Sequence, residues 1–445
     1  MEHYTVLAVG LAVGLLLLSI IRFSVHPFLA LLGSALVLGI MAGQGFPATI
    51  ETILDGFADT LRWIGLVMVL GTLIGEILHK TGASYRIADS ILRLVGKKRI
   101  PLTMGLTGYV VSIPVFVDVA YIMLQPIVES LARHSRLKLL VVGLSLTAGL
   151  TATHALLPPT PGPLAGAGIL GADLGRAIIL NIVVALFAVA GGISWVLFYC
   201  SRVSLPFDTS TNETTDTAET FQQQVQSAPS AFGSFTPILL PLALIASASF
   251  MDAEHNALMH SFMRFLGHPV VALMIGVAGA AFLLKSRPRM KQLGTLLDGA
   301  ITKSAVVIMI TGAGGAFGAV IKAADIGASV TAGVESIGIP GILLPFMLAA
   351  AMTTSTGSLT VSMVTTASLM AALLPGLGMS PEMALALIGA GSFCVIHANS
   401  SFFWLLSKLH DVPPQILYRT FTMQSLCMGI GGFIGASILW ICGIR

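Results

Sequence analysis

The sequence predicts an all-α polytopic membrane protein made of two inverted repeats, each with about five transmembrane helices and one re-entrant hairpin. Three observations support this fold class. The 445 residues are 55% hydrophobic and only 10% charged, with a mean hydropathy of +0.92, whereas soluble domains are about 25% charged. Several motifs recur at one constant offset along the chain. Two apolar blocks, 101–131 and 340–375, are each interrupted by a polar segment.

Apolar stretches that could cross a bilayer make up most of the chain. A hydrocarbon core of about 30 Å needs about 20 helical residues, and shorter spans occur. The predicted spans are 4–21, 27–43, 63–78, 139–157, 177–200, 235–251, 269–284, 304–321, 383–398 and 420–442. The protein is therefore expected to reside in a lipid bilayer.

Charge and cysteine content argue against several other functions. The net charge of +3 does not indicate a nucleic-acid partner, because the basic residues are sorted by loop. The four cysteines have no CxxC spacing, so they predict neither a disulfide framework nor a metal site. We expect no cofactor.

An internal repeat divides the chain into two similar units. Matching pairs at an offset of 242 or 243 are His26 with His268, Asp55 with Asp298, Gly71 with Gly314, His154 with His397, and Arg176 with Arg419. The predicted units are a first repeat over 1–200 and a second over 234–445. The polar stretch 201–233, rich in Ser, Thr and Gln, is predicted to be a disordered cytoplasmic linker between them.

The two interrupted blocks predict re-entrant hairpins. In the first, Asp118 follows Pro114 by four residues, and the apolar arms on either side are at most about 12 residues, or about 18 Å, which is too short to span. The constant offset maps this tip onto 355–362, which contains Gly357 and a run of hydroxyl side chains. Five full spans and one hairpin make an odd number of crossings, so the second repeat should be inverted, as in many secondary transporters.

Lysine and arginine residues predict the orientation. They concentrate in the segments 79–100, 133–138 and 285–303, whereas the opposite side keeps only Arg62, Arg176, Arg264, Lys322 and Arg445. The basic side is the cytoplasmic one by the positive-inside rule. Both termini then face outward, the first hairpin opens inward and the second opens outward.

Asp118 is the first candidate for chemistry, because a carboxylate at membrane depth is costly unless it takes up a proton, binds a cation or is paired. The alternative is a structural aspartate that caps the second half of the hairpin. Glu76 is interpreted differently: it lies four residues before Lys80, so a local ion pair is expected rather than a coupling role.

Two symmetry-related histidines each lie beside an expected helix break. His154 precedes a cluster of four prolines in 158–163, where the helix cannot continue, and residues 155–163 are expected to be extended. His397 is followed by Asn399, Ser400 and Ser401. A lone membrane histidine is usually a packing residue, but the repetition favours a place in a site for both.

The second tip supplies hydroxyl groups that suit an anion with hydroxyl substituents. Serine and threonine also help helices pack closely in membranes, but six of them surround Gly357 here. The predicted substrate-binding residues share a position at a hairpin tip or a helix break, and they are Ser112, Asp118, His154, Thr160, Ser355, Thr356, Gly357, Ser358, Thr360, His397, Asn399 and Ser400.

The chain resembles the gluconate permease family of bacterial sugar-acid transporters, within the ion transporter superfamily. The resemblance rests on TGYVVSIPVFVDVAYIMLQPI in the first hairpin, THALLPPTPGP, ITGAGGAFGAVI and GSLTVSMVTTASL. It implies an inner-membrane permease rather than an enzyme, proton-coupled import of a gluconate-like acid, an elevator mechanism and a homodimer. Asp118 and His154 would then be the proton carriers.

Two departures from the family pattern concern the site. Family members that import gluconate commonly have a histidine where this chain has Thr160, and many have an aspartate where it has Ser400. The first departure favours a different or smaller sugar acid, and the second leaves Asp118 as the more isolated carboxylate. D-serine is the alternative substrate, and sodium held by hydroxyl-rich tips is the alternative coupling ion.

Overall fold

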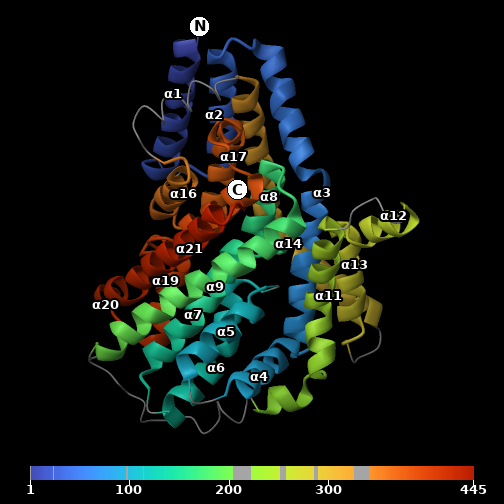
Figure 1. Ribbon diagram of the computed structural model, residues 1–445, viewed down its shortest axis with the longest axis vertical. Helices are drawn as coiled ribbons and strands as arrows, with labels where there is room; N and C mark the ends of the chain where they lie inside the picture. The colour runs from blue at the N-terminus through green and yellow to red at the C-terminus, as the bar shows by residue number, and fades with distance from the viewer. Residues whose placement is uncertain are drawn as a thin grey trace.

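The structure is a computed structural model that describes residues 2–23, 25–96, 99–113, 115–135, 137–203, 222–250, 257–284, 289–324 and 340–444 (Figure 1). The described residues are helical, with no strand among them. In the first half the helices are α1 (Glu2–Ile21), α2 (Pro27–Met41), α3 (Phe46–Lys80), α4 (Ala83–Val95), α5 (Ile100–Val111), α6 (Val117–Ser135), α7 (Leu139–Leu156), α8 (Pro161–Leu170) and α9 (Leu174–Phe198), followed by the 3₁₀ turn η2 (Cys200–Arg202).

The second half has a similar series of helices. They are α11 (Ala231–Ser249), α12 (Ala257–Leu266), α13 (Pro269–Ala281), α14 (Arg289–Ala323), α16 (Leu343–Thr356), α17 (Leu359–Leu377), α18 (Pro381–Ser392), α19 (Ser401–His410), α20 (Pro414–Leu417), the π-helical turn η3 (Tyr418–Thr422) and α21 (Met423–Ile441). The bounds of α14 are those of α3 shifted by 243 at both ends.

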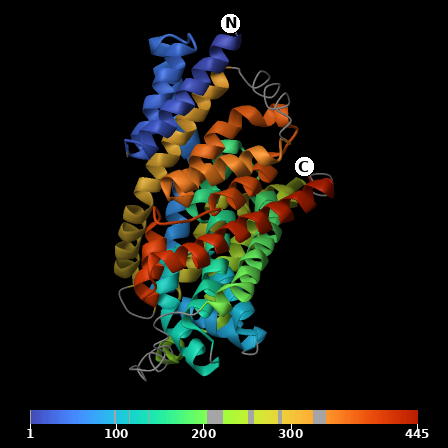
Figure 2. The ribbon, with the colours of Figure 1, turned by 90° about the vertical axis from the view of Figure 1, so that its left-hand side faces the viewer.

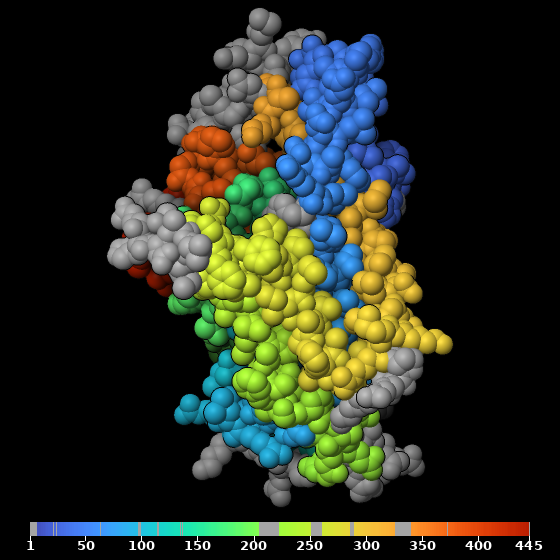
Figure 3. Space-filling view, turned by 90° about the vertical axis from the view of Figure 1, so that its right-hand side faces the viewer, coloured from blue at the N-terminus to red at the C-terminus, as the bar shows by residue number. Residues whose placement is uncertain are grey.

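The two 35-residue helices α3 and α14 pack antiparallel. Near one end Phe57 of α3 covers Gly312, and near the other Glu76 pairs with Lys303 at 2.5 Å. The helices approach closely because a Cβ atom on Gly56 would lie only 2.9 Å from the carbonyl oxygen of Gly315. The pair runs along one side of the molecule (Figure 2), and α11 and α13 cover a neighbouring face beside α3 (Figure 3). Glu76 therefore pairs across the two halves, and the prediction of a local pair with Lys80 is wrong.

The core is centred on α7, where every residue from Leu140 to Leu156 except His154 is buried. A helix that is apolar or small on all sides is typical of such a central position. It contacts α5 backbone to backbone, since a Cβ atom on Gly108 would lie 2.4 Å from the carbonyl oxygen of Leu146. The equivalent atom on Gly149 would lie 1.9 Å from the carbonyl oxygen of Gly105.

Several predicted boundaries differ from those in the structure. Helices α3 and α14 begin at Phe46 and Arg289, well before the spans predicted at 63 and 304. In α3 the prediction started late because exposed charged side chains, among them Glu51, Asp55 and Asp59, interrupt the apolar pattern of the N-terminal half. Within the described residues, six helices are long and apolar enough to cross a membrane, and the bent pair of α12 and α13 would make a seventh. That is fewer than the ten full spans predicted. Helices such as α2, with 15 residues, and α13, with 13, are shorter than a full membrane span.

The basic segment 79–100 and the linker also contain more structure than predicted. Helix α4 occupies most of the first, with Ile87 and Ile91 buried. Residues 222–227 of the predicted linker are helical, and the Arg86 side chain donates hydrogen bonds to the carbonyl oxygens of Val225 at 2.6 Å and Pro229 at 2.9 Å. The last part of 201–233 is therefore packed against α4, and residues 204–221 lie outside the described part of the chain.

Replacing Gly149 with alanine tests the α5–α7 contact. The added methyl group has no space, and overpacking of this kind costs about 1–3 kcal/mol in the free energy of unfolding. We expect Gly149→Ala to lower the thermal midpoint in detergent. Gly65→Ala is the matched control, because no atom lies within 4 Å of the added Cβ and alanine is the better helix former. Equal midpoints for both variants would contradict the contact.

Candidate functional site

Four helix interruptions lie around one region of the molecule. Short non-helical segments separate α5 from α6, α7 from α8, α16 from α17, and α18 from α19. The α7–α8 break is limited to 157–160, because α8 already begins at Pro161, where proline is well tolerated. The extended segment predicted over 155–163 is therefore shorter in the structure.

A cavity of about 170 Å³ lies where these interruptions meet. Its lining comes from three of the breaks and from the last turns of α7, and consists of Phe116, Val117, Asp118, Thr151, His154, Gly357, Ser358, Leu359, Thr360, Ile396, Ser400, Ser401 and Phe402. The first residues of α6, α17 and α19 are among them, so three helix N-termini meet at the cavity. No lysine or arginine is among these lining residues.

Helix N-termini supply the positive electrostatic character of this cavity. The first backbone N–H groups of a helix have no partner within the helix, and the macrodipole adds about half a positive charge there. An anion can therefore be held without a basic side chain. Asp118 lies in the first turn of α6 and is the acidic residue of the lining.

Two polar atoms of α7 beside the cavity are buried without a hydrogen-bond partner in the described residues. They are Oγ1 of Thr151 and Nδ1 of His154, three residues apart and therefore on one face of the helix. The His154 ring lies 5.8 Å from the ring of Phe116, centroid to centroid. Since buried polar atoms are nearly always bonded, both atoms are candidates for contact with a ligand or water.

Six of the predicted residues line the cavity, namely Asp118, His154, Gly357, Ser358, Thr360 and Ser400. Ser112 instead donates to the carbonyl oxygen of Val115 at 3.2 Å inside the first tip. Ser355 and Thr356 donate to carbonyl oxygens one turn earlier in α16. These three are therefore not placed against the cavity.

His397 and Asn399 contact the backbone at the end of α16, next to the second tip. Nε2 of His397 lies 2.9 Å from the carbonyl oxygen of Thr354, and the Asn399 amide donates to the same oxygen at 2.8 Å. Gly357 closes α16 with a φ of +72°, and a Cβ atom there would lie 2.2 Å from the carbonyl oxygen of Asn399. These two side chains thus hold the end of α16, whereas the repeat mate His154 lines the cavity.

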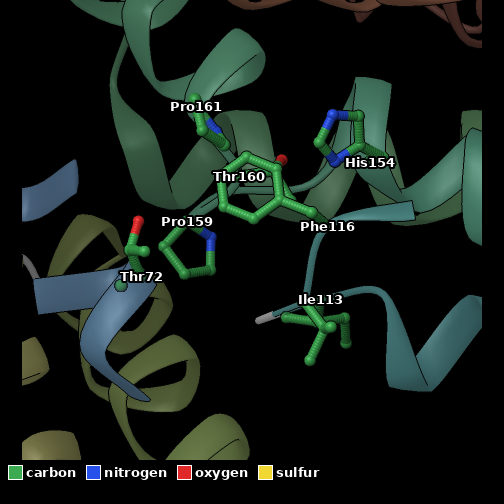
Figure 4. Close-up of a pocket in the computed structure, with 9 residues that line it drawn as sticks. Thr72, Ile113, Phe116, His154, Pro159, Thr160 and Pro161 are labelled. Atoms are coloured by element: carbon green, nitrogen blue, oxygen red, sulfur yellow. The ribbon is translucent and has the colours of Figure 1, made fainter. Parts of the chain in front are cut away.

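Thr160 lies beside a separate, smaller crevice that shares Phe116 and His154 with the cavity (Figure 4). Its hydroxyl group donates to the carbonyl oxygen of Leu157. The residues that sequence reasoning missed include Thr151, Ser401 and the aromatic rings of Phe116 and Phe402. Helical spacing from His154 could have found Thr151.

The described part of the chain holds no group of three or more His, Cys, Asp and Glu side chains placed to bind a metal ion. The chemistry available at the cavity is therefore that of hydroxyl groups, helix N-termini, one carboxyl group and one imidazole ring. Such a set can bind an anion and take up a proton.

Comparison with known proteins adds the family. A gluconate permease of Pseudomonas aeruginosa is 32% identical over 95% of this chain and 94% of its own length. The high-affinity gluconate transporter of Escherichia coli is 30% identical over 97% and 98%, and the D-serine transporter DsdX of Escherichia coli is 29% identical over 96% of both.

The fold has a solved counterpart in the YdaH transporter of Alcanivorax borkumensis. The TM-score is 0.67 at 15% identity, over 94% of this chain and 99% of that one, which shows a common fold. The sequence profile of GntP family permeases matches residues 4–442. The predicted resemblance is confirmed: the chain belongs to the GntP family of permeases.

Proposed function

We propose that this inner-membrane permease imports a small sugar acid together with a proton, and that the 170 Å³ cavity is the binding site. The observation that carries the proposal is the convergence of three helix N-termini on a cavity lined by hydroxyl groups and Asp118. The carboxylate of the substrate would lie at the helix N-termini. Its hydroxyl groups would bond to Thr151, Ser358, Thr360 and Ser401.

The position of Asp118 supports coupling to protons. Two negative charges about 4 Å apart repel by ~4 kcal/mol at an effective dielectric constant of ~20. A substrate carboxylate in the same cavity therefore binds better when Asp118 is protonated, and by linkage the substrate favours protonation. The proton also cancels the charge of the anion, which otherwise enters a negative interior at a cost of about 2.3 kcal/mol per 100 mV.

The wider architecture supports movement between two sides of the membrane. Helices α3 and α14 occupy equivalent positions in the two repeats, since their bounds differ by the constant offset, and they run antiparallel. An inverted repeat requires this opposite direction of equivalent helices. In an elevator mechanism this pair would belong to the fixed part, and the helices around α7 would carry the site. The homodimer, the hairpin topology and the division at 201–233 remain predictions.

D-serine is the second candidate, and one observation favours it. An amino acid carries an ammonium group as well as a carboxylate, and Asp118 in the cavity could accept a hydrogen bond from that group. With D-serine the aspartate would have to stay ionised, whereas with a sugar acid it would be protonated. The two substrates thus need opposite states of the same side chain.

Counterflow in proteoliposomes identifies the substrate. We expect the purified protein to exchange labelled D-gluconate, L-idonate or D-glycerate against the unlabelled compound, and to exchange D-serine poorly. Exchange of D-serine alone would support the second candidate. Failure to exchange any of the four would contradict the proposed function.

Asp118→Asn tests the coupling. The amide cannot take up or release the proton, so accumulation driven by a pH gradient should be lost. Counterflow needs no net proton movement and should continue. A variant that still concentrates substrate under a pH gradient, or a native protein that requires sodium, would contradict proton coupling through Asp118.

Thr151→Val tests the hydroxyl group that lacks a partner. The substitution keeps the shape of the side chain and removes one hydrogen bond to substrate, so KM in counterflow should rise about fivefold, or ~1 kcal/mol. Thr147→Val is the matched control one turn earlier, where the buried hydroxyl group donates to the carbonyl oxygen of Gly143 at 2.9 Å. Equal KM values in both variants would exclude Thr151 from the site.

A further inference from the structure

Two small crevices lie beside the cavity, along α3. The first is lined by Gly71, Thr72, Ile113, Val115, Phe116, His154, Pro159, Thr160 and Pro161, and the second by Thr72, Gly75, Glu76, His79, Val115, Phe116 and Val119. The cavity and the first crevice share Phe116 and His154, and the two crevices share Thr72, Val115 and Phe116. The three spaces are therefore neighbours, ordered from the site to Glu76.

The first crevice lies between three elements. Figure 4 shows Thr72 of α3 on one side and His154 of α7 on the other, with Phe116, Pro159 and Thr160 between them. Helix α3 can approach this closely because residue 71 is glycine: a Cβ atom there would lie 2.8 Å from Cβ of Pro159. Helix α3 therefore packs closely against the α7–α8 break.

The size of the crevices limits what can pass. Each has a volume of about 10 Å³, which is the lower limit of the roughly 10–15 Å³ that one water molecule needs. A sugar acid cannot follow this route, but one water molecule fits in each crevice. A buried water molecule also needs two or more polar partners.

Each crevice offers such partners. The first has the hydroxyl groups of Thr72 and Thr160, and His154, whose Nδ1 has no partner among the described residues. The second has Thr72, the Glu76 carboxylate and His79. Thr72 belongs to both, so its hydroxyl group is placed to contact water in each.

The series ends at charged groups near the end of α3. The Glu76 side chain is 20% exposed and pairs with Lys303 of α14, which is 45% exposed. His79 lies on the same end of α3, with Nδ1 3.3 Å from the sulfur of Met123 on α6, and Lys80 follows it. This end of α3 is the one that the lysine and arginine distribution assigns to the cytoplasm.

We propose that the two crevices form a water path by which the coupled proton leaves the cavity for the cytoplasm, with Thr72 as the positioning residue between them and Glu76 as the exit acceptor. The proposal rests on proton symport as the function. The proton released by Asp118 passes within the cavity to His154, which also lines the first crevice. His154 then gives a proton to the first water molecule, which passes one to the second, and that one to Glu76. Glu76 releases it to bulk water, so each water molecule and Glu76 return to their starting state.

The test measures proton and substrate movement separately in proteoliposomes. The probe is whichever of D-gluconate, L-idonate, D-glycerate and D-serine drives the largest proton uptake by the native protein, followed with an enclosed pH-sensitive dye. We expect Thr72→Val to lower substrate-driven proton flux about fivefold or more through loss of one water partner, with counterflow unchanged. Thr72→Ser keeps the hydroxyl group and should retain the native flux.

Matched controls separate the path from general damage. Thr52→Val makes the same change on α3, where the hydroxyl group donates to the carbonyl oxygen of Ala48 away from both crevices, and should behave as native protein. Glu76→Gln should lower proton flux like Thr72→Val. Lys303→Gln breaks the same ion pair but keeps the acceptor, and should retain flux.

The outcomes distinguish the path from the function. If no probe drives proton uptake by the native protein, both the proposed proton symport and the proposed water path are wrong. If native protein couples to protons and both Thr72→Val and Glu76→Gln keep native flux, the path alone is wrong. Loss of flux in Lys303→Gln equal to that in Glu76→Gln would assign the effect to the ion pair and overturn the role of Glu76 as acceptor.

Discussion

Helices that stop inside an apolar protein leave backbone groups that must find partners elsewhere, and this requirement governs the centre of the structure. Side chains of neighbouring helices meet it. Thr153 donates to the carbonyl oxygen of Tyr109 at 2.8 Å, and the Asn181 amide donates to that of Leu156 at 2.8 Å. In the other half, the Ser425 hydroxyl accepts from the backbone N–H of Ile396 at 2.9 Å. The breaks are held by ordinary polar residues on neighbouring helices.

The same breaks explain why the cavity has its electrostatic character. Once a helix is interrupted, its second part presents an N-terminus at the point of interruption, and α6, α17 and α19 all do so at the cavity. Positive potential is thereby created without a buried lysine or arginine, whose charge would be costly at this depth. Binding and backbone geometry are in this respect one feature, because a continuous helix at any of these positions would remove part of the site.

Much of the fold could be predicted from sequence, because glycine, proline and a single carboxylate in an apolar block mark a break clearly. The tip at Gly357 and the place of Asp118 are of this kind. Hydroxyl side chains could not be assigned as well, since a helical serine or threonine readily bonds to the carbonyl oxygen one turn earlier, as Ser355 and Thr356 do. Repeat symmetry also misled: His154 and His397 occupy matching positions, but only the former faces the cavity.

The ion pair between Glu76 and Lys303 has a consequence for the origin of the chain. At the repeat offset of 243 its counterpart would join Thr60 to Ala319, which carry no charge. Two identical chains related by a twofold axis must form every contact twice, so this single ion pair requires that the two copies have diverged in sequence. A bridge present at one end of the α3–α14 pair alone makes that end different from the other, although the two helices share their repeat positions.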